Sequence, residues 1–327
     1  MDYFKKILFI GLGKIALKHI KIMNQLYPKI EIHVLRSGKG QKQLISKKYQ
    51  LIKNFDEIKK KKFNAIFITS PSSTHHSILK KIYREKSSLF IEKPIFNKLE
   101  NIGFILKSIK ENKIVNQVGY VFRHDEVFLK FKNLLKKNLI GKIIHVNIYC
   151  GSSLNNWKIS KDPKKSIYVK KNTGGGVLLE LSHEIDYALW LFGKFKEVDA
   201  SLYNTKTFGN QVEDTANIVL TNFKNQRINI HLNFWQKNSE RLCVVYGTQG
   251  TMKIDIIKRK IYINNNKKRI INFSSKFQES YKKQIKNFVS SIKNKKRTRI
   301  DIEDSIESLK IIEKIRLSNK LNKRVRV

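Results

Sequence analysis

The sequence predicts an α/β protein in two parts, a parallel doubly wound sheet followed by a sheet of mostly antiparallel strands. Up to about residue 121, short continuous apolar runs alternate with helical patterns, as expected for strands that are covered on both faces and joined by helices. Beyond residue 123, most strand candidates alternate apolar and polar residues, which is typical of a sheet with one covered face. We therefore expect domains at residues 1–122 and 123–327.

A glycine-rich turn near the N-terminus predicts a dinucleotide site. Residues 6–10 form a buried strand candidate, residues 11–16 (Gly-Leu-Gly-Lys-Ile-Ala) form the turn, and a helical pattern follows. Gly11 permits a tight turn, Gly13 lets the backbone approach a pyrophosphate, and Ala16 allows close packing of helix and strand. The helix N-terminus offers N–H groups and a positive dipole to the phosphates. The expected cofactor contacts in this motif are Gly11, Gly13, Lys14, Ile15 and Ala16.

The end of the second strand candidate, residues 30–35, bears on the choice between NAD and NADP. An NAD site usually has an acid at this strand end to bind the ribose hydroxyls. Here Arg36 and Ser37 follow, and both suit a 2′-phosphate, so we expect a slight preference for NADP. A solvated arginine without this role would give the same pattern.

Two further strand ends belong to the same edge of the predicted sheet. The apolar run 65–69 ends in Thr69, before a turn that contains Pro71 and His75. A helix at 78–86 leads to the run 89–91, and a helix at 102–111 and a strand at 114–121 complete this part. Ligands of such sheets bind beyond the carboxyl ends of the strands, so these ends should line one crevice.

Lys93 stands at the most informative of these strand ends, within Glu92-Lys93-Pro94. Proline cannot continue a central strand and restricts the backbone of the residue before it. The ammonium of Lys93 is therefore expected to point beyond the sheet. An ordinary surface turn is the alternative reading of the same residues.

The second half is expected to form one sheet, with a helix before its strands and a helix after them in the chain. A helix at 126–137 precedes the strand candidates, and a long helix at 302–317 closes the chain. The strands are expected at 142–150, 198–203, 215–221, 227–235, 241–246, 251–256 and 260–263. One face of this sheet should remain available to a partner.

One helical segment of the second half combines acids with a histidine. Three glycines at 174–176 precede a helix expected to run to Gly193, and Glu180, His183 and Asp186 follow at intervals of three. An acid one turn before a histidine can orient the imidazole and adjust its pKa, as general-base work requires. An amphipathic helix with a solvated polar face would show the same pattern.

Composition and charge argue against several classes of function. The formal charge of +41 arises from lysines along the whole chain, and their densest clusters, 59–62 and 293–299, contain no interleaved aromatics, so we expect no specific nucleic-acid partner. No apolar run approaches the roughly 18–20 residues of a membrane span. The N-terminus lacks the features of a signal peptide, and Cys150 and Cys243 form no metal or redox motif. We expect a cytoplasmic protein without a metal site.

These motifs together resemble the glucose–fructose oxidoreductase / inositol dehydrogenase / rhizopine-catabolism (Gfo/Idh/MocA) family of NAD(P)-dependent oxidoreductases. The matching signals occur in the family's order and cover nearly the entire chain. They are the turn at 11–16, Pro71 with His75, Glu92-Lys93-Pro94, Gly119-Tyr120 with Arg123, Gly174-Gly175-Gly176 with His183 and Asp186, and the closing run from Tyr281 through Phe288 to Leu317.

The resemblance implies a Rossmann domain, an α/β domain whose open sheet face forms homodimers or homotetramers, and hydride transfer between nicotinamide and a hydroxyl-bearing carbon. The substrate would be a sugar, a polyol or a nucleotide sugar. By the same analogy Lys93 hydrogen-bonds the reacting hydroxyl and His183 takes its proton, and a cis Lys93–Pro94 bond would fix the lysine's direction. Thr69, Pro71, His75, Glu92 and Lys93 would contact the cofactor. Arg123, Tyr149, Trp157, Tyr168 and Asp186 would contact the substrate.

One position departs from the family pattern. Members usually have an aspartate four residues before the histidine, whereas this chain has Leu179 there and Glu180 as the nearest acid. Either Glu180 takes the place of that acid, as a catalytic residue, or the chain works without it. The motif Glu-Leu-Ser-His-Glu-Ile-Asp at residues 180–186 resembles that of family members encoded with surface-polysaccharide enzymes, which points to a sugar substrate.

Two other functions remain open on this fold. One is reduction of an enone or imine, and the other is a non-catalytic sensor that binds the dinucleotide and a partner protein. The presence of both Lys93 and His183 argues against the sensor, because a binding protein needs neither at a hydride site.

Overall fold

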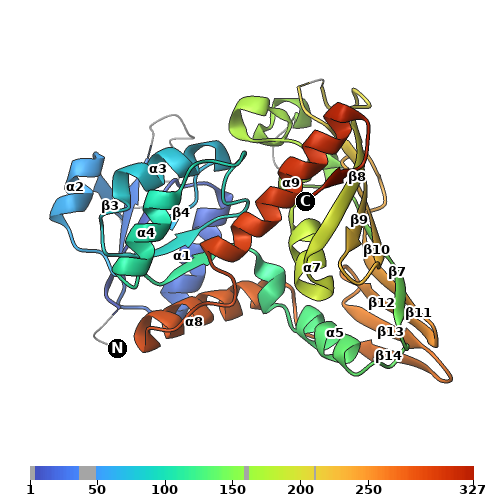
Figure 1. Cartoon of the computed structure of the whole chain (residues 1–327). Helices are drawn as coiled ribbons and strands as arrows, with labels where there is room; N and C mark the ends of the chain where they lie inside the picture. The colour runs from blue at the N-terminus through green and yellow to red at the C-terminus, as the bar shows by residue number, and fades with distance from the viewer. Residues whose placement is uncertain (1–3, 37–48, 158–161, 210) are drawn as a thin grey trace. The chain divides into compact units, whose positions relative to one another are not determined.

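The computed structural model describes residues 4–36, 49–157, 162–209 and 211–327, and the chain divides into two compact units (Figure 1). The first unit comprises residues 1–121 and 277–306, and the second comprises 122–276 and 307–327. The segment 277–306, assigned from the sequence to the second domain, therefore groups with the first unit, because helix α8 (Gln278–Asn294) packs into the core of the first sheet. The boundary at 122/123 between folding domains stays a prediction.

A six-stranded sheet forms the centre of the first unit. All of its strand pairs are parallel, in the order β3-β2-β1-β4-β5-β6. This is the doubly wound order of a dinucleotide-binding fold, so the predicted parallel sheet is confirmed. The strands are β1 (Lys6–Ile10), β2 (Glu31–Leu35), β3 (Gln50–Ile52), β4 (Ala65–Ile68), β5 (Ser88–Ile91) and β6 (Asn116–Val118).

Helices cover both faces of this sheet, which explains why its strands are continuous apolar runs. In Figure 1, α1 and α8 lie on one side of the sheet and α3 and α4 on the other. On the α1 side, Phe67 stacks between Phe9 and Phe90, with centroids 4.7 and 4.9 Å away. The alternate residues, such as Leu8 and Ile66, are equally buried on the other side. The helices are α1 (Lys14–Leu26), α2 (Phe55–Lys60), α3 (His75–Ile82), α4 (Gly103–Glu111) and α8, with a 3-10 turn at Ser72–Thr74.

Several boundaries in the first unit differ from the sequence-based expectation. Strand β3 was not expected, because it has only three residues at the sheet edge and Leu51 is 50% exposed. Helix α3 begins at His75 rather than Ile78, directly after the turn that contains Pro71. Strand β6 is shorter than the expected 114–121, and a 3-10 turn at Val121–His124 follows it.

A nine-stranded sheet forms the centre of the second unit, in the order β14-β13-β12-β11-β7-β10-β9-β8-β15. Among its described pairs, β7 with β10 is parallel and the others are antiparallel, as expected. The short strands β14 and β15 were not expected. The strands are β7 (Ile143–Gly151), β8 (Phe195–Tyr203), β9 (Thr215–Asn222), β10 (Arg227–Asn233), β11 (Glu240–Gly247), β12 (Gly250–Asp255), β13 (Lys260–Asn264), β14 (Lys268–Asn272) and β15 (Val325–Arg326).

Helices cover one face of this second sheet. Figure 1 shows α5 and α7 on the same side of it. On that side β7 buries Val146, Ile148 and Cys150, whereas the alternate residues Asn147 and Tyr149 are only half-buried on the other face. The helices are α5 (Glu126–Lys136), α6 (Val177–Glu180), α7 (His183–Phe192) and α9 (Ile302–Leu321), which begins in the first unit. Further 3-10 turns are Leu154–Trp157, Pro163–Lys165, Ile167–Val169 and Lys171–Thr173.

The helix expected to run unbroken to Gly193 is in fact two helices. Leu181 and Ser182 separate α6 from α7, and the amide of Ser182 bonds to the carbonyl of Leu179, three residues back, rather than four. The regular helical spacing assumed between Glu180 and His183 is therefore wrong. Propensity alone does not reveal such a break, because every residue from Val177 to Leu181 except Glu180 is buried and is placed by packing.

Candidate active site

Gly11 is the point at which three strand ends of the first unit approach one another. Its φ of +96° lies in the region that favours glycine, and an added Cβ would stand 2.7 Å from the backbone nitrogen of Ser70. Its N–H donates to the carbonyl of Leu35 at 3.0 Å, and its own carbonyl accepts from the Thr69 hydroxyl at 2.9 Å. The ends of β1, β2 and β4 are thus tied at this turn.

Gly13 presents an open helix N-terminus at the same edge. It is the N-cap of α1, has no side-chain cap, and an added Cβ would meet no atom within 4 Å. Lys14 is exposed, and the first turn of α1 contains no acid. The terminal N–H groups and the positive end of the helix dipole therefore face an open space that suits a pyrophosphate. The residues present fit a dinucleotide.

The other residues of the turn have different environments. Ala16 is fully buried in the core between α1 and the sheet, as expected for close packing of helix and strand. Ile15 is half-buried. Arg36 is half-buried and directly follows Leu35. Because the carbonyl of Leu35 accepts a hydrogen bond from the N–H of Gly11, Arg36 is one residue away from a direct contact with the cofactor turn. Ser37 lies outside the described residues.

His75 is a buried link rather than an exposed contact. Its Nε2 lies 2.8 Å from the carbonyl of Ser70, its Nδ1 lies 2.9 Å from the carbonyl of Ile95, and the residue is 1% exposed. Burial lowers the pKa of the imidazole, and its contacts with the two carbonyls oppose that shift. His75 thus connects the end of β4 to the segment after Pro94, whereas Pro71 is exposed at the edge.

Lys93 and Glu92 follow β5 and differ in burial. Lys93 is half-buried, and the Lys93–Pro94 bond is cis, as the resemblance had suggested. Glu92 is 8% exposed and faces the interior, where its Oε1 lies 2.6 Å from Nε2 of His19 on α1. Its expected contact with the cofactor stays a prediction. No sequence pattern we used singled out His19.

His183, the first residue of α7, packs on a fixed aromatic ring. The ring of Phe122 lies 4.8 Å from its own and is stacked on Phe128 at 4.6 Å. The guanidinium of Arg241 lies 4.4 Å from the Phe122 centroid. Arg241 is itself held by Glu184, at 2.7 and 2.9 Å, and Glu184 is completely buried. These supporting residues were missed, because they come from separate strands, turns and helices.

Glu180, Tyr168 and Trp157 lie in one neighbourhood of the second unit. Burial, followed by the charge of Glu180, raises the pKa of Tyr168 to about 12. The rings of Trp157 and Tyr168 meet edge-on at 5.5 Å, and the Tyr168 carbonyl accepts from the N–H of Gly176 at 2.9 Å. Leu179, at the family's aspartate position, is 1% exposed and belongs to the core. Glu180 is the half-buried acid of this segment.

Tyr149 lies on the face of the second sheet opposite to α7. Its ring stacks on His231 at 5.0 Å, its hydroxyl donates to Gln236 at 2.5 Å, and it lines a cavity of about 350 Å³ with Asn217 and Asn229. The strand alternation that turns Cys150 toward Glu184 turns Tyr149 away from it. The structure therefore does not bring Tyr149 to the side of His183.

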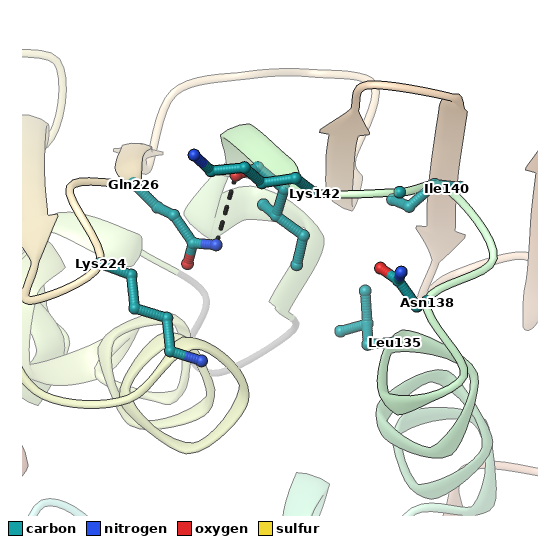
Figure 2. A pocket seen from close by; sticks show the side chains of 8 residues that line it. Leu135, Asn138, Ile140, Lys142, Lys224 and Gln226 are labelled. Carbon is teal, nitrogen blue, oxygen red and sulfur yellow. Dashed lines mark hydrogen bonds between the residues drawn. The ribbon is translucent and has the colours of Figure 1, made fainter.

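A larger cavity, of about 440 Å³, lies between the end of α5 and the start of β7 (Figure 2). Its lining includes Lys142, Lys224 and Gln226, whose amide donates to the carbonyl of Ile143 at 3.3 Å. None of the sequence-predicted site residues lines it. Cavity volume therefore does not identify the active site here.

The described residues contain no group of three or more His, Cys, Asp or Glu side chains placed to hold a metal ion. They also contain no helix that combines the length and the apolar character of a membrane span.

Comparison with protein families gives two matches that together cover most of the chain. Residues 5–120 match the model of the oxidoreductase family with an NAD-binding Rossmann fold, designated GFO_IDH_MocA. Residues 132–327 match the C-terminal alpha/beta domain of the same oxidoreductase family. The order of the two matches is the order of the two sheets.

Individual relatives are distant in sequence. The chain is 26% identical over 262 residues to an uncharacterized oxidoreductase of Bacillus subtilis, covering 76% of this chain and 73% of the relative. It is 20% identical over 311 residues to a myo-inositol 2-dehydrogenase of Thermotoga maritima, covering 90% of each. A solved levoglucosan dehydrogenase, in complex with NADH and levoglucosan, superposes with a TM-score of 0.85 over 99% of both chains at 15% identity, which shows a shared fold.

Proposed function

Because this chain belongs to the Gfo/Idh/MocA oxidoreductase family, we propose that it transfers a hydride between NAD(P) and a hydroxyl-bearing carbon of a sugar, polyol or nucleotide sugar. The observation that carries the proposal is the open, uncapped start of α1 at Gly13. That helix end lies at the same sheet edge as the end of β5, which Lys93 follows.

The bound nicotinamide supplies the hydride chemistry. The ammonium of Lys93 would donate a hydrogen bond to the reacting oxygen and stabilise the negative charge that develops on it. The imidazole of His183 would accept the hydroxyl proton during oxidation and return it during reduction. Glu180 remains a candidate acid for tuning His183, supported by its half-buried place at the end of α6.

NADP is the proposed preferred cofactor, supported by Arg36 and the lack of an acid directly after β2. Kinetics with both cofactors test this: kcat/KM for NADP should exceed that for NAD. Arg36→Leu should lower kcat/KM for NADP by roughly 10-fold, as expected when a charged hydrogen-bond donor to a phosphate is lost, and should leave NAD nearly unaffected. A clear preference of the unmodified protein for NAD would contradict the proposal.

A sugar substrate is supported by the names of the relatives, which include myo-inositol and levoglucosan dehydrogenases. A role in surface-polysaccharide sugar synthesis is part of the proposal and rests on the sequence motif around His183 alone. The face of the second sheet that carries the half-buried residues Asn147 and Tyr149, opposite to α5 and α7, supports a homodimer or homotetramer. The buried free thiols of Cys150 and Cys243 support a cytoplasmic location.

The test is an assay of the reduced-nicotinamide absorbance with each cofactor and a panel of polyols, sugars and nucleotide sugars. We expect cofactor-dependent turnover of at least one alcohol in the panel. Binding of the cofactor without turnover of any alcohol, enone or imine would indicate a sensor. Turnover of enones or imines alone would indicate the alternative reductase.

A further inference from the structure

We propose that His19 is a positioning residue for Lys93, acting through the carboxylate of Glu92. It would tie the helix that begins at the cofactor turn to the backbone that carries the lysine. The inference rests on the proposed function for its catalytic consequence. All of its contacts lie within the first unit.

The proposed link consists of two hydrogen bonds to one carboxylate. Nε2 of His19 lies 2.6 Å from Oε1 of Glu92, and the backbone N–H of Lys93 donates to Oε2 at 3.2 Å. An ionised carboxylate only accepts hydrogen bonds, so the imidazole donates through Nε2. One side chain on α1 therefore reaches the peptide unit of Lys93 through a single intermediate residue.

The carboxylate of Glu92 occupies space that a side chain at position 119 would fill. A Cβ added at Gly119 would stand 2.7 Å from Oε2 and 3.1 Å from Oε1 of Glu92. The backbone of Gly119 is itself fixed, because its N–H donates to the carbonyl of Ile91 at 2.8 Å. Gly119 thus leaves room for the carboxylate, and His19 and the Lys93 amide hold its two oxygens there.

The surroundings of His19 make its hydrogen bond hard to replace with water. The side chain is completely buried, with the rings of Phe90 at 5.0 Å, Tyr281 at 6.0 Å and Phe67 at 6.2 Å. Burying a carboxylate beside such rings costs free energy unless a hydrogen-bond donor or a cation pairs with it. Lys18 is a second cation near this carboxylate: it lies over the ring of Tyr281, burial lowers its pKa, and the charge of Glu92 opposes that shift.

Helix α1 connects this link to the cofactor turn. The helix begins at Lys14, where the cofactor phosphates are proposed to bind, and His19 lies five residues further along it. A helix is rigid over so short a distance. The place where the dinucleotide binds and the place where Lys93 leaves β5 are therefore joined by one hydrogen-bonded path.

Two substitutions of His19 separate positioning from packing. The amide nitrogen of Gln in His19→Gln can donate from nearly the position of Nε2, whereas His19→Leu fills the space without a donor. His33→Leu is the matched control, since His33 is also a buried histidine of this unit, packed edge-on to Phe63 at 5.1 Å, and its Nε2 lies 3.7 Å from the carboxylate of Glu31 rather than beside that of Glu92.

Hydrogen exchange at the Lys93 amide is the first readout and needs no substrate. We expect exchange about 10-fold faster in His19→Leu, because weakening the carboxylate contact frees the amide more often. His19→Gln and His33→Leu should stay within about 3-fold of the unmodified protein. Unchanged exchange in a folded His19→Leu protein would overturn the proposal.

Turnover is the second readout. We expect His19→Leu to lower kcat roughly 10- to 100-fold while the dissociation constant of the cofactor changes less than about 3-fold, and His19→Gln to recover most of the loss. Equal loss in both variants, or a parallel loss of cofactor affinity, would refute positioning. If the unmodified protein turns over no substrate, the proposed function fails while the exchange result still decides the link.

Glu92→Gln guards against a variant that fails to fold. It removes the buried charge that His19→Leu leaves without its partner. In this background the added effect of His19→Leu on Lys93 exchange should shrink to less than about 3-fold, because the path runs through the carboxylate. A full 10-fold effect there would show that His19 acts by another route.

Discussion

Arg123 and Asp186 form a two-point ion pair inside the second unit. Nε of Arg123 donates to Oδ2 of Asp186 at 3.1 Å and Nη2 donates to Oδ1 at 2.8 Å, and their side chains are 8% and 1% exposed. The hydroxyl of Ser308 also donates to Oδ1, at 3.3 Å. Both residues were expected to contact a substrate. We propose instead that they brace α7, whose first residue is His183.

Removing one charge of this pair should destabilise the protein strongly. Asp186→Asn leaves the guanidinium of Arg123 buried without its counter-charge, so we expect a loss of roughly 3–5 kcal/mol in the free energy of unfolding. Urea unfolding measures it. The control is Glu307→Gln, which breaks a half-exposed pair with Lys310 (2.7 Å) and should cost less than about 1 kcal/mol. Similar losses in the two variants would contradict the bracing role.

Lys93 and His183 should each be needed for turnover but not for cofactor binding. We expect Lys93→Met and His183→Ala to lower kcat by roughly 10²–10⁴-fold, the range for acid–base groups, with cofactor affinity nearly unchanged. Steady-state kinetics and titration of the bound reduced cofactor check this. Lys98→Met is the control, since Lys98 is 67% exposed shortly after the same strand. Full activity of both test variants would remove them from the mechanism.

The two glycines of the cofactor turn should respond differently to alanine. Gly11→Ala forces a Cβ to 2.7 Å from Ser70 at a positive φ, so stability should fall by at least about 1 kcal/mol. Gly13→Ala meets no protein atom within 4 Å and should change stability by less than about 1 kcal/mol. It should nevertheless weaken cofactor binding, because the Cβ enters the space proposed for the pyrophosphate. Thermal melts with and without cofactor separate the two effects.

Lys132 predicts a pH dependence of stability. Its Nζ lies 4.2 Å from the Trp190 ring centroid, and burial, followed by the charges of Arg123 and Lys136, lowers its pKa from 10.5 to about 8. Between pH 8 and 10.5 the unfolded chain then binds more protons at this site than the folded one, so this group's contribution to stability rises with pH through that window.

Lys132→Met should therefore stabilise the protein at pH 7, and the gain should shrink between pH 8 and 10.5. The side chain is half-buried, so solvent screening limits the gain to less than about 1 kcal/mol. Lys130→Met, at an exposed position of the same helix, is the control and should show no such trend, since Lys130 is not among the charges that lower the pKa of Lys132. A destabilised Lys132→Met protein at pH 7 would mean that the contact with Trp190 outweighs the burial of charge.

Patterns that depend on neighbouring residues were predictable. The turn at Gly11 and Gly13, the buried strands around it and the alternating strands of the second sheet follow from local conformation and from the period of apolar residues. The position of Lys93 directly after a strand was predicted for the same reason, since Pro94 ends the strand locally.

Contacts between distant segments were not predictable in this way. The inward turn of Glu92 depends on His19, 73 residues earlier, and on Gly119, which has no side chain to fill the space. The break between α6 and α7 depends on packing of the buried residues around Leu181, and the grouping of α8 with the first sheet depends on Phe288 meeting Phe67 and Phe90.

The sequence alone therefore determined the fold class and the cofactor turn, because these follow from local conformation and periodicity, and its resemblance to the family singled out Lys93 and His183 as candidates. Only the tertiary structure decided which of the other polar candidates face the interior. Asp186 and Glu92 are buried against partners far away in the chain, and Tyr149 lies on the face opposite to α7. The physical reason is that a charged or aromatic side chain takes its direction from the partner that satisfies it, and residue type and spacing do not reveal that partner.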